Sequence, residues 1–89
     1  MTYAATEGVS AERSADHIIV LDQQGEVLRT LNAVGALVWE QLPATIDDLV
    51  DHVAQQYPAV GRERLAADVG RFLDELVAKG LVEELDAPS

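Results

Sequence analysis

The sequence predicts an α+β fold in which a three-stranded antiparallel sheet is followed by three helices. The first observation is a β-branched apolar run at His17–Leu21, which turn-forming residues join to an alternating segment, as in a hairpin. The second is the spacing of apolar residues after position 32, which recur every three or four positions, as in amphipathic helices. Because two or three strands cannot bury both faces alone, we expect the helices to cover one side of the sheet.

The three expected strands lie in the first part of the chain. A first, edge-like strand is expected around Glu7 to Glu12, in a weakly patterned segment, and a second at His17 to Leu21. Asp22 to Gly25 predicts a turn, in which glycine supplies a positive φ. The third strand, Glu26 to Leu31, is expected to leave one edge of the sheet uncovered. Its side chains alternate between two faces: Val27, Arg29 and Leu31 on one, Leu28 and Thr30 on the other.

The first two expected helices begin at residues that commonly cap helices. Asn32 is a suitable N-cap for a helix that runs to about Leu42 and ends at Pro43. Thr45 caps a second helix, which the Tyr57-Pro58 pair closes.

The third expected helix is the longest and runs from about Arg62 to Lys79. Gly61 precedes it, and Gly80 suits the C′ position that follows a helix. The last residues, 86–89, are expected to fray. The apolar stripe of this helix consists of Leu65, Val69, Phe72, Leu73, Leu76 and Val77.

Length, charge and composition limit the possible partners. The 89 residues predict one domain, with a core over about residues 7–82 and frayed ends. The 6 basic and 16 acidic residues give a formal charge of −10, which repels nucleic-acid phosphates and anionic membrane surfaces. We therefore expect no nucleic-acid partner and no stable membrane insertion. With no cysteine, no bilayer-length apolar run and no signal-peptide pattern, a cytoplasmic location is the simplest expectation.

No motif in the sequence indicates catalysis, a metal or a cofactor. His17 and His52 are isolated, without the His-x-x-His or Glu-x-x-His spacing of metal ligands. Asp47, Asp48 and Asp51 are interpreted as a solvated acidic helix face, because they lack the apolar neighbours that would separate their pKa values. We therefore expect a binding protein and not an enzyme.

The order of strands and helices is winged-helix-like, which makes DNA binding through the third helix an alternative. Residues 62–79 carry four basic and four acidic side chains, a net charge of zero. A helix that reads a DNA groove normally carries a basic excess. A winged-helix DNA-binding regulator is therefore the less favoured interpretation.

Two motifs resemble those of PqqD-like domains, the RiPP recognition elements. One is Asn-x-x-Gly-x-x-Val-Trp after a hairpin, at Asn32–Trp39, and the other is Asp-Val-x-x-Phe-Leu-x-x-Leu-x-x-x-Gly-Leu, at Asp68–Leu81. With Tyr57 between them, the resemblance covers roughly residues 17–82. It implies a protein that binds the leader segment of a ribosomally synthesised precursor peptide. Like the discrete recognition proteins of lasso-peptide biosynthesis, it would present that leader to a leader peptidase or another modifying enzyme.

The resemblance further implies that the leader adds as a strand along Glu26 to Leu31, with its side chains against the third helix. For Phe72, Leu65 and Val69, core packing is the alternative interpretation. Gly70 indicates either close approach of this helix to a backbone or a tolerated surface glycine. The implied leader-binding residues are Val27, Leu28, Arg29, Thr30, Leu31, Arg64, Leu65, Asp68, Val69, Arg71 and Phe72.

Most of the scarce positive charge is expected near the same cleft, on Arg29, Arg62, Arg64 and Arg71. We hypothesise that these arginines orient an acidic stretch of the leader. Ordinary solubility charges are the alternative.

Overall fold

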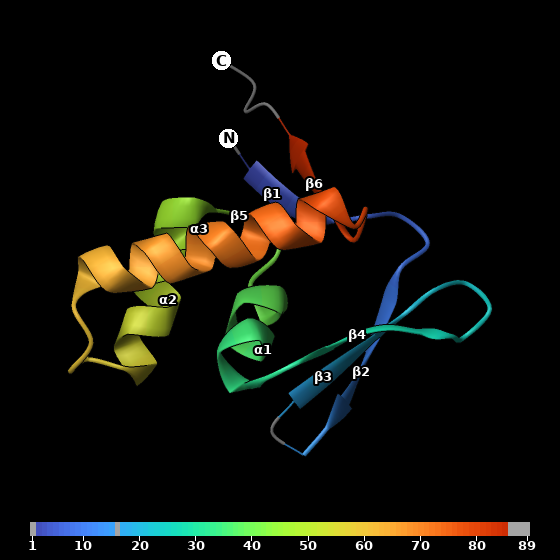
Figure 1. The fold of residues 1–89 in the computed structure, drawn as a ribbon, viewed down its shortest axis with the longest axis horizontal. Coiled ribbons are helices and arrows are strands. Elements are labelled where there is room, and N and C mark those ends of the chain that lie inside the picture. Colours follow the sequence, from blue (N-terminus) through green and yellow to red (C-terminus); the bar gives the residue numbers. More distant parts are fainter. Residues whose placement is uncertain (1, 16, 86–89) are drawn as a thin grey trace.

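The computed structural model describes residues 2–15 and 17–85, which form six strands and three helices (Figure 1). The predicted α+β class is confirmed, with further strands near both ends and between the first two helices. In chain order the elements are β1 (Thr2–Ala5), β2 (Ser10–Ser14), β3 (His17–Leu21), β4 (Val27–Leu31), α1 (Ala33–Glu40), β5 (Ala44–Thr45), α2 (Ile46–Gln56), α3 (Arg62–Ala78) and β6 (Val82–Leu85).

Strands β2, β3 and β4 form the predicted antiparallel sheet, with β3 in the centre and Ile18 opposite Leu31. The predicted turn joins β3 to β4. In it, Asp22 Oδ1 accepts hydrogen bonds of 2.9 Å from two backbone N–H groups, and Gly25 has a φ of +83°. Within the part of the chain that the structure describes, β4 pairs with β3 alone, so its other edge is open, as predicted.

The first, edge-like strand predicted around Glu7 to Glu12 is present as β2, but it begins and ends later, at Ser10–Ser14. Glu7 and Gly8 lie instead in a turn between β1 and β2, which belong to different sheets, and Gly8 has a φ of +89°. All five residues of β2 are exposed, so no alternation of buried and exposed positions marks the strand in the sequence.

The second sheet of the described residues has the order β5-β1-β6. Thr2 pairs with Thr45 on one side and with Leu85 on the other. The sheet thus joins residues 2–5 to residues 82–85, although a core of about 7–82 was predicted. Its strands are short and far apart in sequence, which is why no local pattern indicates them. The fraying expected of residues 86–89 concerns a segment outside the described residues.

The predicted helix caps are confirmed. Asn32 Oδ1 accepts a hydrogen bond of 2.9 Å from the N–H of Gly35 at the start of α1, and Thr45 Oγ1 accepts one of 3.2 Å from the N–H of Asp48 in α2. After α3, Gly80 has a φ of +77°, a conformation that glycine adopts without strain and that ends the helix.

The core lies on both sides of α1, which is near the centre of the molecule in Figure 1. None of the helices in the described residues is long and apolar enough to cross a membrane. One buried cluster joins α1 to the sheet and to the end of α3: Ile18, Val20, Leu31, Ala36, Leu76, Leu81 and Val82. The other joins α1, α2 and α3: Val38, Leu49, Val50, Val53, Leu65, Val69 and Leu73.

Candidate functional site: an open strand beside a groove along α3

The open edge of β4 contains a β-bulge. Val20 lies opposite Arg29, but the next residue pair is Leu21 with Val27, so the register skips Leu28. An extra residue of this kind interrupts the alternation of side chains along a strand. Arg29 is half-buried, whereas Val27 is 62% exposed. The prediction that Val27 points to the same face of β4 as Arg29 is therefore wrong.

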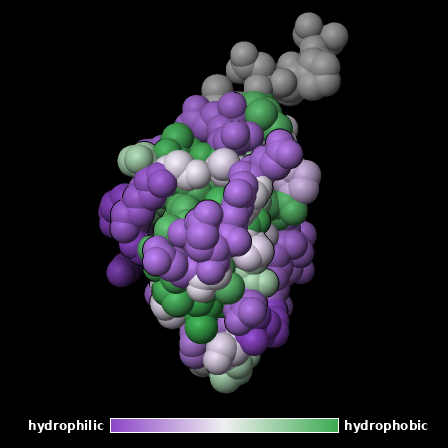
Figure 2. Space-filling model, turned by 90° about the vertical axis from the view of Figure 1, so that its right-hand side faces the viewer, coloured by the Kyte–Doolittle hydropathy of each residue, from purple (hydrophilic) through white to green (hydrophobic). Residues whose placement is uncertain are grey.

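The two edges of this sheet differ in character. Figure 2 looks onto the side of the molecule that is at the right in Figure 1, and apolar surface (green) is exposed there between hydrophilic side chains (purple). From β4, Val27 and Leu28 are exposed apolar residues, the latter at 41%. The opposite edge strand, β2, carries Glu12 and Arg13, and charged residues on an edge discourage pairing with another chain. The β4 edge is the better suited to accept a further strand.

A groove runs along α3 and consists of two adjacent hollows. The strand-side hollow, of about 350 Å³, lies next to the end of β4, between the start of α1 and α3. The loop-side hollow, of about 540 Å³, lies between α3 and the loop that precedes it. Val34 and Asp68 line both, so the hollows are adjacent. The strand-side hollow is also lined by Asn32, Gly35, Arg71, Phe72 and Glu75, and the loop-side hollow by Tyr57, Val60, Arg64, Leu65 and Val69, among others.

Phe72 lies against α1 at Gly35. A Cβ atom on Gly35 would be 2.9 Å from Phe72 Cζ and 3.2 Å from Leu31 Cβ, so the absence of a side chain allows this contact. The ring is half-buried and packs against both core clusters while it also lines the strand-side hollow. Phe72 therefore belongs to the core and to the groove, which resolves the two interpretations offered for it.

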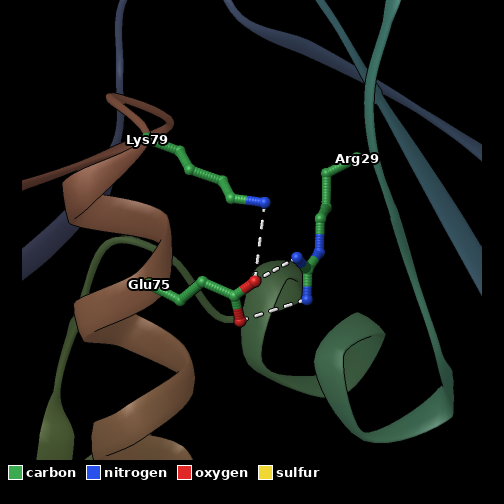
Figure 3. A network of polar contacts seen from close by, with 3 residues as sticks. All are labelled: Arg29, Glu75 and Lys79. Atoms are coloured by element: carbon green, nitrogen blue, oxygen red, sulfur yellow. Dashed lines mark hydrogen bonds and ion pairs between the residues drawn. The ribbon is translucent and has the colours of Figure 1, made fainter.

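An ion pair joins β4 to α3 beside the strand-side hollow (Figure 3). Arg29 donates hydrogen bonds to both carboxylate oxygens of Glu75, with Nη2 3.2 Å from Oε2, and Lys79 Nζ lies 3.5 Å from Oε1. The hydrogen bond from Arg29 is the largest effect and lowers the pKa of Glu75 below its ordinary 4.5; burial opposes it, and the charges of Arg29 and Lys79 lower the pKa further. Glu75 is therefore ionised at neutral pH and ties the helix to the open strand.

A second charge cluster lies where the two hollows meet. Arg64 Nε is 3.9 Å from Asp68 Oδ2, and Arg71 Nη1 is 3.8 Å from Asp68 Oδ1. Both separations exceed the length of a hydrogen bond. Arg62, also predicted to lie near the cleft, lines neither hollow. It hydrogen-bonds to Asp51 of α2, because its position on α3 faces that helix.

The other predicted contact residues come together around β4 and α3, at different depths. Leu31 and Val69 are fully buried and Leu65 nearly so, which places them beneath the groove as support. Val27, Leu28 and Thr30 are exposed along β4. Contact of any of these residues with a peptide stays a prediction.

Sequence reasoning missed Val34, Val60 and Glu75 as groove residues. Val60 lies in a loop, whose path no periodicity predicts, and Val34 lies on the short α1. A signal did exist for Glu75, which follows Arg71 by four residues and Asp68 by seven and so lies on the same face of α3.

Gly70 does not mark close approach of α3 to another backbone. A Cβ atom there would have Ile46 Cδ1, at 3.6 Å, as its neighbour within 4 Å, which is an ordinary side-chain contact. The interpretation as a tolerated glycine is the one that fits.

This arrangement is suited to holding an extended chain. A peptide can add to an open strand through its backbone while its side chains enter adjacent hollows. Across residues 2–15 and 17–85, no group of three or more His, Cys, Asp and Glu residues could hold a metal ion.

The fold and the groove define a small α+β domain with an open strand beside a helix. The chain belongs to the family described as coenzyme PQQ synthesis protein D (PqqD), whose sequence profile matches residues 17–82. Among solved structures, it is similar to TbiB1 in complex with the TbiA(beta) leader peptide, at 26% identity and a TM-score of 0.82 over 94% of this chain and 99% of that chain. No curated protein matches the chain significantly. The resemblance drawn from the two sequence motifs is thereby confirmed.

Proposed function

We propose that this protein binds the leader segment of a ribosomally synthesised precursor peptide along the open edge of β4 and in the adjacent groove of α3. The observation that carries the proposal is the open edge of β4 beside this groove. Support comes from membership of the PqqD family and from the similarity to TbiB1, whose structure was solved with a leader peptide. The proposed role is binding and presentation, without catalysis by this chain.

Strand addition would set the direction of the bound leader but would contribute little to the affinity of binding. The bulge at Leu28 leaves Arg29–Leu31 as the regular part of the edge, enough for about three backbone hydrogen bonds at about 1 kcal/mol net each. Ordering the leader costs about 1–2 kcal/mol per residue, which offsets those bonds. Side chains must therefore supply most of the affinity.

The loop-side hollow is the proposed anchor site. Its volume of about 540 Å³ accommodates a large side chain, and Tyr57, Val60 and Leu65 give it an apolar lining. Burial of one aromatic or aliphatic leader side chain contributes about 1.5–3 kcal/mol.

We further propose that the bound leader is presented to a leader peptidase or another precursor-modifying enzyme, with a lasso-peptide pathway favoured by the resemblance. Asp47 and Asp48 are exposed on α2 and do not line the groove, so this face is free to contact such an enzyme.

A titration tests the leader-binding proposal. The full chain is titrated with synthetic peptides that tile the N-terminal halves of short open reading frames encoded beside its gene, with a scrambled version of each peptide and with duplex DNA. We expect one leader-derived peptide to bind more tightly than its scrambled version and to slow amide hydrogen exchange in residues 27–31. If every peptide binds no better than its scrambled version, or if duplex DNA binds more tightly, the proposal is wrong.

A further inference from the structure

The positive charge of this chain is concentrated along the groove. Of the 6 Lys and Arg residues, Arg64 and Arg71 lie on one face of α3 at seven-residue spacing, Lys79 directly follows the helix, and Arg29 reaches the same helix from β4. The formal charge of the whole chain is −10. This surface is therefore locally positive, although the electrostatic field of the whole protein is negative.

Arg64 and Arg71 differ from the other cations of the chain in their surroundings. Their side chains are 81% and 79% exposed, and both have Asp68 as their carboxylate neighbour, at 3.9 Å and 3.8 Å. The cluster of two arginines and one aspartate has a net charge of +1. The remaining four cations, Arg13, Arg29, Arg62 and Lys79, pair with carboxylates at side-chain exposures of 28–59%.

The position of this cluster matters as much as its charge. Arg64 lines the loop-side hollow, Arg71 lines the strand-side hollow, and Asp68 lines both. A group that enters the groove near Asp68 therefore lies between two guanidinium groups of α3, one on each hollow. The planar N–H groups of a guanidinium match the two oxygens of a carboxylate, and hydrogen bonds between ionised groups are the stronger kind.

We propose that Arg64 and Arg71 bind a carboxylate side chain of the captured peptide, so that the groove selects an acidic residue near an apolar anchor. The inference rests on the proposed leader-binding function. The hypothesis drawn from the sequence assigned this role to four arginines. The structure reduces them to two, because Arg29 pairs with Glu75 and Arg62 pairs with Asp51. The carboxylate at the junction and the apolar side chain in the loop-side hollow together fix the register of the peptide on β4.

This inference is tested by selecting peptides that bind the wild-type chain from a displayed random library. General electrostatics predicts enrichment of Lys and Arg, because the protein is strongly acidic. We expect instead that Asp or Glu is enriched at a constant distance from an apolar residue. In a parallel selection, the double variant Arg64→Gln/Arg71→Gln should keep the apolar preference and lose the acidic one. Arg62→Gln, a matched loss of charge on α3 outside the groove, should retain both.

A double-mutant cycle with one enriched peptide gives the magnitude. Replacing its acidic residue by the corresponding amide should weaken binding to the wild type about tenfold, which is about 1.4 kcal/mol, and should leave binding to the double variant unchanged. A Lys replacement should bind Arg71→Glu better than it binds the wild type, a gain that a purely structural role for Arg71 would not produce.

The outcomes separate this inference from the proposed function. If the wild-type chain selects apolar anchors without an acidic preference, the carboxylate site is wrong and leader binding stands. If no enriched peptide slows hydrogen exchange in residues 27–31, both are wrong.

Discussion

The guanidinium of Arg29 on β4 pairs with both carboxylate oxygens of Glu75 on α3, so the open strand and the helix across the groove are tied together (Figure 3). Lys79 adds a second cation to the same carboxylate. The link between β4 and α3, at one wall of the strand-side hollow, therefore depends on the ionisation of Glu75.

This pair predicts a specific dependence of stability on pH. The pKa of Glu75 is lower in the folded chain than its ordinary 4.5, chiefly because of the hydrogen bond from Arg29. Its contribution to stability is therefore fully present above pH 4.5 and is lost as the pH falls through the lower folded pKa. Wild type and Glu75→Gln should differ in urea midpoint at pH 7, and the difference should shrink below pH 4.5. A difference that stays constant from pH 7 to pH 3 would contradict this.

Gly35→Ala should move the Phe72 ring. The added Cβ atom would lie 2.9 Å from Phe72 Cζ, and the adjacent Leu31 Cβ at 3.2 Å limits any escape. The gain of about 1 kcal/mol in helix propensity is offset by about 1–3 kcal/mol of overpacking, so we expect a net loss of about 1 kcal/mol in unfolding free energy. Near-UV circular dichroism and urea unfolding check the change, and unaltered aromatic signals with increased stability would contradict it.

Gly70→Ala is the matched control on α3 and should act in the opposite direction. The new methyl group meets Ile46 Cδ1 at 3.6 Å, an ordinary contact, and the glycine lies in a helix interior. Removing the conformational freedom of glycine should raise the unfolding free energy by about 1 kcal/mol, with peptide binding unchanged. Loss of peptide affinity without loss of stability would show that this position contacts the ligand.

Val60→Ser should weaken binding of a groove-bound peptide without unfolding the protein. Val60 is an exposed apolar residue that lines the loop-side hollow, so its replacement removes apolar contact from the proposed anchor site. A loss of about 1 kcal/mol corresponds to about fivefold weaker binding by calorimetry. Leu85→Ser, an exposed apolar residue of β6, is the control and should bind as the wild type does. Equal weakening by both substitutions would argue against the hollow as the anchor site.

The sequence predicts the groove only in part. The alternation of Glu26 to Leu31 places an open strand before α1, and the motif at Asp68–Leu81 places Phe72 and Asp68 on the helix opposite. The bulge at Leu28 could not be predicted, because it arises from the pairing of β3 with β4 and not from either strand alone. The partner of Arg62 could not be predicted either, because its contact with Asp51 depends on how α3 packs against α2, whereas Arg64 and Asp68 are four residues apart on α3.

By itself, the sequence determined the features that are local along the chain. These are the hairpin from β3 to β4, the caps at Asn32 and Thr45, and the end of α3 at Gly80, because turn chemistry and periodicity act between residues a few positions apart. Tertiary structure alone decided the sheet that joins β1 to β6, the Arg29–Glu75 pair and the contact of Phe72 with Gly35. Each of these joins residues more than thirty positions apart, whose meeting depends on how the whole core packs.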